Sequence, residues 1–452
     1  MTGFQYPDSH VFYRKLGHAY PKIVRGDGCW LIDERGKRYL DAVGGAYVAN
    51  LGHSNPEIAE AMEQQARQFG YLSGTMFTHG PVEELADELA ATLPGDLSKL
   101  YFLCSGSEAV EAALKLARQY WVERGQSSKH KIIALGPGYH GSTLLALSAS
   151  AREAHKAPFR PWLVDVHRIP APYPYRCECG GRGTACPVCS AAVLEQAIEQ
   201  LGAENVAAFI AEPVGGSSTG ASTPRPEYFK RVREICDRHE VLFIADEVLV
   251  GVGRTGTWWA IEPYGVTPDI MTFGKGVSGG YAALSGIAAP ERIVDALARG
   301  SGSFLHAQTF SHHPVACAAG VATMRYLKQH KLVERCAKMG RLLQEKLAPL
   351  TKLPHVGDVR GRGLLAGIEF VDDKASRAPL PRSARFAEKF ADAAIDVGIT
   401  VWPNVGHADG TSGDAALIAP PFIVTEEEIG EIVRRLTAAV EKTVSAVKVR
   451  AS

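Results

Sequence analysis

Short apolar segments alternate along this chain with amphipathic segments of helical length, and this alternation restricts the possible folds more than any other feature. The apolar segments are nearly continuous, which is typical of parallel strands buried on both faces. They are LYFLC (100–104), KIIAL (131–135), VAAFIA (206–211), VLFIA (241–245) and IMTF (270–273). Helical periodicity marks 108–121, 226–239 and 313–330. The sequence therefore predicts an open α/β sheet.

The two ends of the chain have a different pattern. A hairpin-like run turns at residues 33–36, and the part after about residue 330 mixes helices with short strands. A proline-rich stretch at 158–174 indicates a long loop. We expect a large domain at 56–325, with a Cys-rich insert at 158–190, and a smaller domain assembled from residues 1–55 and 326–452.

Polar side chains follow each apolar segment. In open α/β sheets ligands bind beyond the carboxyl ends of the strands, so these side chains are candidates for a site. In chain order they are SGSE (105–108), GPGYH (136–140), Glu212, Asp246 and Lys275.

The chemistry of these groups suggests a cofactor. Residues 105–108 have the pattern of a capping box, and the start of a helix attracts anions; an ordinary helix cap is the alternative. Asp246 follows apolar residues and needs a positive partner if it is buried. Burial would make the amine of Lys275 a usable nucleophile. With the ring of Tyr139, these groups meet the needs of pyridoxal phosphate: a Schiff-base lysine, an acid for the pyridine nitrogen, a phosphate site and a stacking ring.

Two glycine patterns suggest nucleotide binding instead. Residues 274–279 and 251–256 both match G-x-G-x-x-G. A dinucleotide fingerprint must open a helix, whereas strand-like YAALSGIAA follows the first match and TWWAIEPYG the second. A P-loop requires Ser or Thr after the lysine, and residue 276 is glycine. An NAD-dependent dehydrogenase is therefore a remote alternative.

Many ordered motifs together resemble the class III (ω-type) aminotransferases, and among them the amine:pyruvate transaminases. The motifs are DAVGGAYVANLGHSNPEI, SGSEA, PGYHGST, EPV, ADEVLVGVGRTG, FGKG, QTFSHHPVACAAG, VRGRGLLAGIEF and IAPPF. The resemblance implies the pyridoxal-phosphate-dependent transferase fold type I, like aspartate aminotransferase, with a mostly parallel seven-stranded sheet and a smaller α+β domain. It implies transfer of an amino group from a primary amine or ω-amino acid to a keto acid, expected to be pyruvate, by a ping-pong mechanism. An aminomutase, racemase or decarboxylase of the same fold type is the alternative.

The resemblance also implies roles for individual residues. Lys275 would form the bond to the cofactor and shuttle the proton, and Asp246 would pair with the pyridine nitrogen. The remaining cofactor contacts that it implies are Val248 and Tyr139 on the two ring faces, His140 beside Tyr139, Glu212 near the phenolic oxygen, and Gly106 and Ser107 at the phosphate. Thr309 would reach the phosphate of the neighbouring subunit, which implies a homodimer with shared active sites.

Three further residues bear on the substrate. Relatives that act on ornithine or acetylornithine carry, at the place of Ser217, a glutamate that gates the arginine matching Arg360. Without that gate, Arg360 is either a standing carboxylate contact or a structural residue. Trp402 stands where many amine transaminases carry a mobile arginine. With Tyr47 it favours an apolar pocket wall, although either ring can equally belong to the core.

Four of the nine cysteines crowd into CECGGRGTACPVC, namely Cys177, Cys179, Cys186 and Cys189. Four thiolates so close together suggest a structural zinc knuckle, with disulfides or free thiols as the alternatives. The other five cysteines are expected to be small core residues.

The charges are balanced, with 49 basic and 49 acidic residues, so neither nucleic acid nor an anionic membrane is an expected partner. A small molecule is. The first ten residues lack the basic and apolar regions of a signal peptide, and no apolar run approaches the roughly 20 residues that span a bilayer. The expected location is the cytoplasm.

Overall fold

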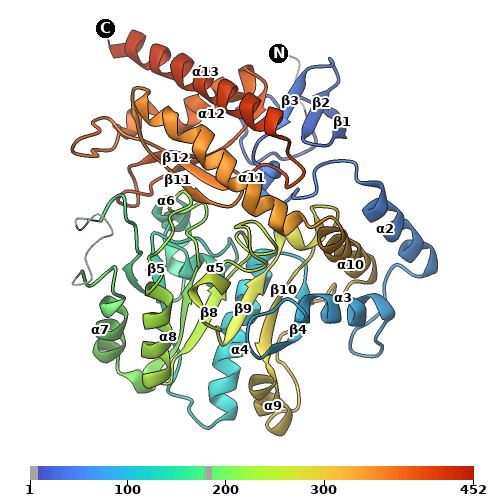
Figure 1. Ribbon diagram of the computed structural model, residues 1–452. Coiled ribbons are helices and arrows are strands. Elements are labelled where there is room, and N and C mark those ends of the chain that lie inside the picture. Colours follow the sequence, from blue (N-terminus) through green and yellow to red (C-terminus); the bar gives the residue numbers. More distant parts are fainter. Residues whose placement is uncertain (1–8, 178, 180–185, 452) are drawn as a thin grey trace.

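The computed structural model describes residues 9–177, 179 and 186–451 (Figure 1). Residues 1–8 of the predicted N-terminal segment, residues 178 and 180–185 of the predicted Cys-rich insert, and Ser452 lie outside the described residues. In the described part of the chain, no helix combines the length and the apolar character needed to cross a membrane.

A seven-stranded sheet forms the centre of the molecule, in the order β4-β10-β9-β8-β7-β5-β6 (Figure 1). β10 is antiparallel to both of its neighbours, and all the other pairings are parallel. The mostly parallel seven-stranded sheet is thus confirmed. Its strands are β4 (Leu97–Leu103), β5 (Lys131–Gly136), β6 (His167–Pro170), β7 (Val206–Ala211), β8 (Leu242–Asp246), β9 (Ile270–Phe273) and β10 (Ser285–Pro290).

The central strands β7, β8 and β9 are apolar except for Asp246, at the end of β8, and Thr272 of β9, because each face packs on a separate core. Phe209 and Phe243 belong to the core that also holds Phe229 of α8, whereas Ile210 and Ile244 belong to the core around α4. Residues alternate between the faces of a strand, so a strand covered on both sides has no solvent-facing positions that favour polar residues.

Helices cover both faces of this sheet (Figure 1). The helices of this part are α2 (Pro56–Gln68), α3 (Gly80–Ala90), α4 (Gly106–Glu123), α5 (Leu144–Ala149), α6 (Glu153–Lys156), α7 (Ala192–Leu201), α8 (Tyr228–Arg238), α9 (Glu291–Arg299) and α10 (Pro314–Gln329). One prediction was wrong here: the proline-rich stretch is not all loop, because the 3-10 helix η1 (Ala157–Trp162) and strand β6 lie within it.

Both ends of the chain build the rest of the molecule together, above the large sheet in Figure 1. One sheet has the order β1-β2-β3-β13 and joins the predicted N-terminal hairpin to a strand near residue 400. The other, in the order β11-β12-β15-β14, is antiparallel. The strands are β1 (Ile23–Asp27), β2 (Trp30–Asp33), β3 (Arg38–Asp41), β11 (Val356–Arg362), β12 (Leu365–Phe370), β13 (Ile399–Thr400), β14 (Trp402–Val405) and β15 (Asp414–Ile418). The helices are α1 (Gly44–Tyr47), α11 (Leu332–Leu347), α12 (Phe386–Asp396) and α13 (Glu426–Ala451).

Candidate active site

A cavity of about 170 Å³ lies where the strands of the large sheet deliver their polar ends. All the residues predicted to contact the cofactor, except Thr309, line it. The lining residues are Ser105, Gly106, Ser107, Tyr139, His140, Gly141, Glu212, Asp246, Val248, Leu249 and Lys275. Of these, Gly141 and Leu249 were not among the predicted site residues, although both are next to predicted ones in the sequence.

Lys275 begins the 3-10 helix η4 (Lys275–Ser278) directly after β9 and Gly274. Burial lowers the pKa of its amine below the ordinary value of 10.5. Nζ lies 6.0 Å from the ring centroid of Tyr47, and it has no hydrogen bond or ion pair to any residue that the structure describes. The backbone of Lys275 is left-handed, with φ 46°, a strained conformation of the kind that gathers at functional sites. The amine is therefore free to react.

Asp246 ends β8 and is 4% exposed. Its Oδ1 accepts hydrogen bonds from Thr272 Oγ1 at 3.0 Å and from the Val248 amide at 3.1 Å, and its Oδ2 lies 2.7 Å from His140 Nδ1. Burial would lower the pKa of His140, but the hydrogen bond and charge of Asp246 outweigh it, so this pKa is raised. A carboxylate has about four acceptor positions, so Asp246 retains one for a further donor.

The start of α4 forms one wall of the cavity. The predicted capping box is confirmed: Ser105 Oγ accepts from the Glu108 amide, and Glu108 Oε2 accepts from the Ser105 amide at 2.8 Å. The first amides of a helix have no preceding carbonyl to bind, which leaves them available to an anion. A Cβ added at Gly106 would lie 2.5 Å from Val248 Cγ1, so only glycine fits at this wall.

Glu212 is held by donors from the surrounding loops. Oε2 accepts from the Tyr139 amide at 3.2 Å and from Ser218 Oγ at 2.9 Å, and Oε1 accepts from the Gly216 amide at 3.0 Å. Burial raises the pKa of this carboxyl group. Glu212 therefore fixes the loop that carries Tyr139 against the end of β7.

Neither glycine pattern has the geometry of a dinucleotide site. η4 is a four-residue 3-10 helix that leads to β10, and residues 251–256 form turns. The Asn50 side chain packs on Gly276 and donates to its carbonyl at 3.1 Å. The absence of a side chain at Gly276 therefore makes room for the side chain of Asn50.

The comparisons with known proteins agree over almost the whole chain. The family model described as aminotransferase class-III matches residues 13–440. An uncharacterised aminotransferase of Schizosaccharomyces pombe is 40% identical over 441 residues, which is 97% of this chain and 96% of that protein.

The chain belongs to the class III aminotransferases.

The names of two further matches state an activity. The putrescine–pyruvate aminotransferase of Pseudomonas aeruginosa is 34% identical over 96% of this chain and 94% of its own. The crystal structure of an amine transaminase from an uncultivated Pseudomonas species, in its PLP-bound form, is 34% identical and superposes with a TM-score of 0.89. The match covers 96% of this chain and 99% of that one. This class III aminotransferase therefore has the predicted fold type I.

Class III aminotransferases use pyridoxal 5'-phosphate, and the cavity of this chain offers a group for each part of that cofactor. The unpaired amine of Lys275 suits an aldehyde, and the remaining acceptor position of Asp246 suits a protonated pyridine nitrogen. The start of α4 offers free amides to a phosphate. Tyr139 supplies an aromatic face. The residues present fit the cofactor.

The predicted substrate residues do not all meet at this cavity. The rings of Tyr47 and Trp402 pack with centroids 5.8 Å apart, and the buried Tyr47 Oη has no hydrogen-bond partner among the described residues. Thr309 is exposed and is not part of the cavity wall in this single chain.

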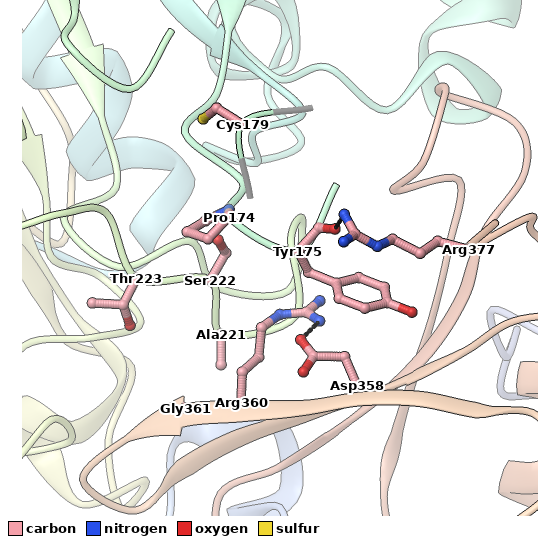
Figure 2. A pocket seen from close by; sticks show the side chains of 10 residues that line it. All are labelled: Pro174, Tyr175, Cys179, Ala221, Ser222, Thr223, Asp358, Arg360, Gly361 and Arg377. Carbon is pink, nitrogen blue, oxygen red and sulfur yellow. Dashed lines mark hydrogen bonds and ion pairs between the residues drawn. The ribbon is translucent and has the colours of Figure 1, made fainter. Parts of the chain in front are cut away.

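Arg360 lines a different cavity, of about 690 Å³ (Figure 2). Its Nη1 donates to Asp358 Oδ2 at 2.8 Å, and its Nη2 lies 2.8 Å from Glu369 Oε2. Burial would raise the pKa of Glu369, but the charges of Arg360, His407 and Arg176 hold it well below the usual range. Two carboxylates of the chain itself therefore neutralise Arg360, which favours the structural alternative over a contact with substrate.

Arg152, which follows α5, was not among the residues predicted from the sequence. Its Cζ lies 4.8 Å from the ring centroid of Tyr139. Nη2 donates to Ser217 Oγ at 2.8 Å and to Asn404 Oδ1 at 3.1 Å, while the buried Nε has no hydrogen-bond partner in the described part of the chain. Among the residues that the structure describes, Arg152 forms no ion pair with a carboxylate. In the sequence Arg152 is one polar residue of the helix-like stretch ASAREAHK, and nothing in that stretch indicates its contacts with Tyr139, Ser217 and Asn404.

Proposed function

We propose that this class III aminotransferase transfers an amino group from a primary amine or ω-amino acid with an apolar portion to a keto acid, with pyruvate as the acceptor. The observation that carries the proposal is the meeting of the Lys275 amine with the buried Asp246–His140 pair in one cavity. The names of the amine transaminase and the putrescine–pyruvate aminotransferase support the choice of substrates.

Each residue of the cavity has a separate role in this reaction. When bound, the cofactor supplies an electron sink for the C–H bond that breaks. Lys275 Nζ holds the cofactor and then takes up the proton that leaves the substrate carbon bearing the amine. Asp246 would accept a hydrogen bond from the pyridine nitrogen and keep it positive, while His140 and Thr272 hold the carboxylate in place. Tyr139 and Val248 would hold the ring of the cofactor, and Glu212 would serve its phenolic oxygen. Gly106 and Ser107 would donate to the phosphate.

Arg152 binds the carboxylate of the keto acid. A buried guanidinium without an anionic partner is costly, and a substrate carboxylate would supply the missing charge. The hydrogen bond from Arg152 to Ser217 supports this role of Arg152, because relatives that act on ornithine or acetylornithine carry their gating glutamate at the place of Ser217. An acid at that place would neutralise Arg152, whereas the serine leaves its charge available.

Tyr47 and Trp402 form the apolar wall for the amine donor. Both rings pack in the cluster that also contains Leu249, which lines the Lys275 cavity. An apolar wall without a charge favours an aryl or alkyl substituent over the second ammonium group of ornithine.

A homodimer completes the site through Thr309. In the single chain Thr309 is exposed, and large apolar side chains near it in the sequence are exposed as well, with Leu305 at 64% and Phe310 at 51%. The ring centroids of Tyr71 and Phe310 are 5.9 Å apart. This contact places the loop that carries the exposed Met76 and Phe77 in the same region. Exposed apolar groups of this kind mark an interface.

Mixing two inactive variants tests the shared site. A dimer of Lys275→Ala and Thr309→Ala subunits has one site with both residues intact, so the mixture should be more active than either variant alone. Activity that stays at the sum of the two variants after subunit exchange would contradict a contribution of Thr309 to its partner.

The reaction itself is tested with an arylalkyl amine and pyruvate, by measuring the alanine formed. Alanine in stoichiometric amount with the ketone or aldehyde product supports the proposal. An isomerised, racemised or decarboxylated product without alanine would identify the alternative reactions of the same fold type. Faster turnover of ornithine or acetylornithine would contradict the proposed donor class.

A further inference from the structure

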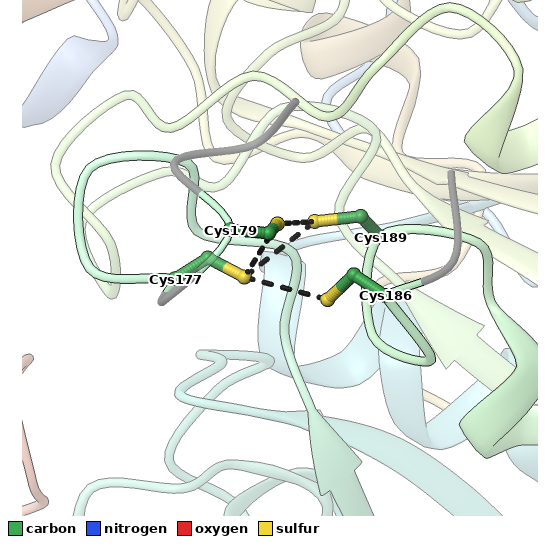
Figure 3. Close-up of side chains that lie close together, drawn as sticks. All are labelled: Cys177, Cys179, Cys186 and Cys189. Atoms are coloured by element: carbon green, nitrogen blue, oxygen red, sulfur yellow. Dashed lines mark hydrogen bonds between the residues drawn. The ribbon is translucent and has the colours of Figure 1, made fainter. Parts of the chain in front are cut away.

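Four cysteine thiols converge in the segment between β6 and α7 (Figure 3). The Sγ atom of Cys177 lies 3.1 Å from that of Cys179, 3.5 Å from that of Cys186 and 3.6 Å from that of Cys189. The Sγ atoms of Cys179 and Cys189 are 3.4 Å apart. All four sulfur atoms lie within 4.8 Å of one another, and no disulfide joins any two of the described cysteines.

These separations fit a shared metal ion better than disulfides. A disulfide brings two sulfur atoms to about 2.05 Å and occupies them in pairs. A zinc ion bound at about 2.3 Å by four sulfur atoms places them at the corners of a tetrahedron with edges of about 3.8 Å. The four separations given above, 3.1–3.6 Å, are slightly shorter than that edge, and the four sulfur atoms form one group (Figure 3).

Backbone hydrogen bonds hold one cysteine on each side of the cluster, Cys177 and Cys186. The amide of Cys177 donates to the carbonyl of Tyr173 at 2.7 Å, and Tyr173 is buried. On the other side, the amide of Ser190 donates to the carbonyl of Cys186 at 2.9 Å, which closes a turn just before α7. Cys-Pro-x-Cys in a tight turn is the spacing at which one half of a zinc knuckle presents two thiolates.

We propose that Cys177, Cys179, Cys186 and Cys189 bind one zinc ion in a closed structural site. Four thiolates fill the tetrahedral coordination shell, so no position remains for a water molecule or a substrate. None of the four lines the Lys275 cavity, and the site therefore serves the fold and not the reaction.

The zinc ion stabilises the wall of the cavity that holds Arg360. Cys179 lines that cavity (Figure 2). Next to Cys177, Arg176 Nη2 lies 2.5 Å from Glu369 Oε1, and the nearby Tyr173 Oη donates to Glu369 Oε2 at 2.6 Å. Because Glu369 also binds Arg360, the metal joins the start of α7 to the ion-pair network of Arg176, Glu369 and Arg360. Loss of zinc should loosen this network.

Metal analysis of the purified enzyme with its cofactor tests the site. Protein expressed with zinc in the medium and passed through gel filtration should carry about one zinc per chain. The Cys177→Ala/Cys186→Ala variant should lose it and unfold at a lower temperature, whereas Cys317→Ala, which removes a buried cysteine in α10, should keep it. Only traces of zinc in the parent, one iron in its place, or full zinc in the double variant would overturn the proposal.

A second measurement does not require the double variant to fold. Exchange of the parent protein into Co²⁺ should produce sulfur-to-cobalt charge-transfer bands and the visible bands of a tetrahedral site. Bound cobalt without charge-transfer bands, or disulfides joining the four cysteines in a non-reducing peptide map, would overturn the proposal. These readouts do not depend on which substrates the enzyme uses.

Discussion

Asp246 Oδ2 and His140 Nδ1 lie 2.7 Å apart in the protein interior, although Asp246 ends β8 and His140 lies in the loop after β5. The other carboxylate oxygen of Asp246 binds Thr272 and the backbone of Val248. These contacts fix the orientation of the carboxylate before any ligand binds, which is the arrangement that lets a charge act on a reacting group without reorganisation.

Asp246→Asn should lower kcat for the amine half-reaction by at least about 100-fold, because the amide cannot keep the pyridine nitrogen positive. Stopped-flow measurement of the cofactor absorbance checks this. Glu247→Gln is the matched control: the neighbouring carboxyl is fully buried, burial raises its pKa to about 8, and it does not line the cavity. This control should lose stability but keep turnover per cofactor-loaded chain. An equal fall in both variants would contradict the role of Asp246.

Lys275→Met should stabilise the protein without its cofactor at neutral pH. Burial lowers the pKa of Lys275 in the folded state, so folding releases a proton or buries a charge, and the lysine costs stability below its folded pKa. The cost disappears as pH rises through the folded pKa toward 10.5, the value in the unfolded chain. Denaturation between pH 7 and 10 should show the gap between variant and parent closing. A constant gap would contradict a lowered pKa.

Arg152→Gln should lower kcat/KM for pyruvate by about 10-fold to 100-fold, the loss expected for a hydrogen bond to a charged group. The same variant should turn over acetaldehyde, which offers a carbonyl without a carboxylate, at nearly the rate of the parent. Measuring the half-reaction of the amine-loaded enzyme with each acceptor gives the rate with pyruvate and the rate with acetaldehyde separately. Equal losses with both acceptors would show that Arg152 acts only through the packing of Tyr139.

Arg360→Gln should instead reduce the free energy of unfolding, by about 3–5 kcal/mol, because it leaves the buried Glu369 without its main partner. The ratio of the pyruvate rate to the acetaldehyde rate should not change. Denaturant titration and the two half-reactions measure both quantities. A selective loss with pyruvate would reassign the carboxylate contact to Arg360.

Trp402→Ala should raise KM for an arylalkyl amine, since it removes an apolar surface worth about 1.5–3 kcal/mol when fully covered. A short amine such as ethylamine should be affected much less. Steady-state kinetics with both donors provide the test. Equal changes for both amines would place Trp402 in the core and not at the substrate.

The sequence predicted the strands that are apolar on both faces, because burial on both sides leaves a signal in every residue. It missed β6, whose residues HRIP are partly polar and lie in a proline-rich stretch. The residues of the cofactor cavity were predictable because each directly follows a strand. The setting of Arg152 was not, since it depends on three segments, around Tyr139, Ser217 and Asn404, that are distant in the sequence.

The contacts of Arg360 were not predictable from the sequence either. Its partner Glu369 lies on the neighbouring strand β12, and the register that brings the two together follows from how the strands pair. A motif can therefore mark a residue as important without stating what it binds.

The attachment of the cofactor tests the central claim most directly. Borohydride reduction of the loaded enzyme, followed by peptide mass spectrometry, should place the cofactor on the peptide that contains Lys275, and Lys275→Ala should carry no label. A label on another lysine, or none in the parent, would contradict the account.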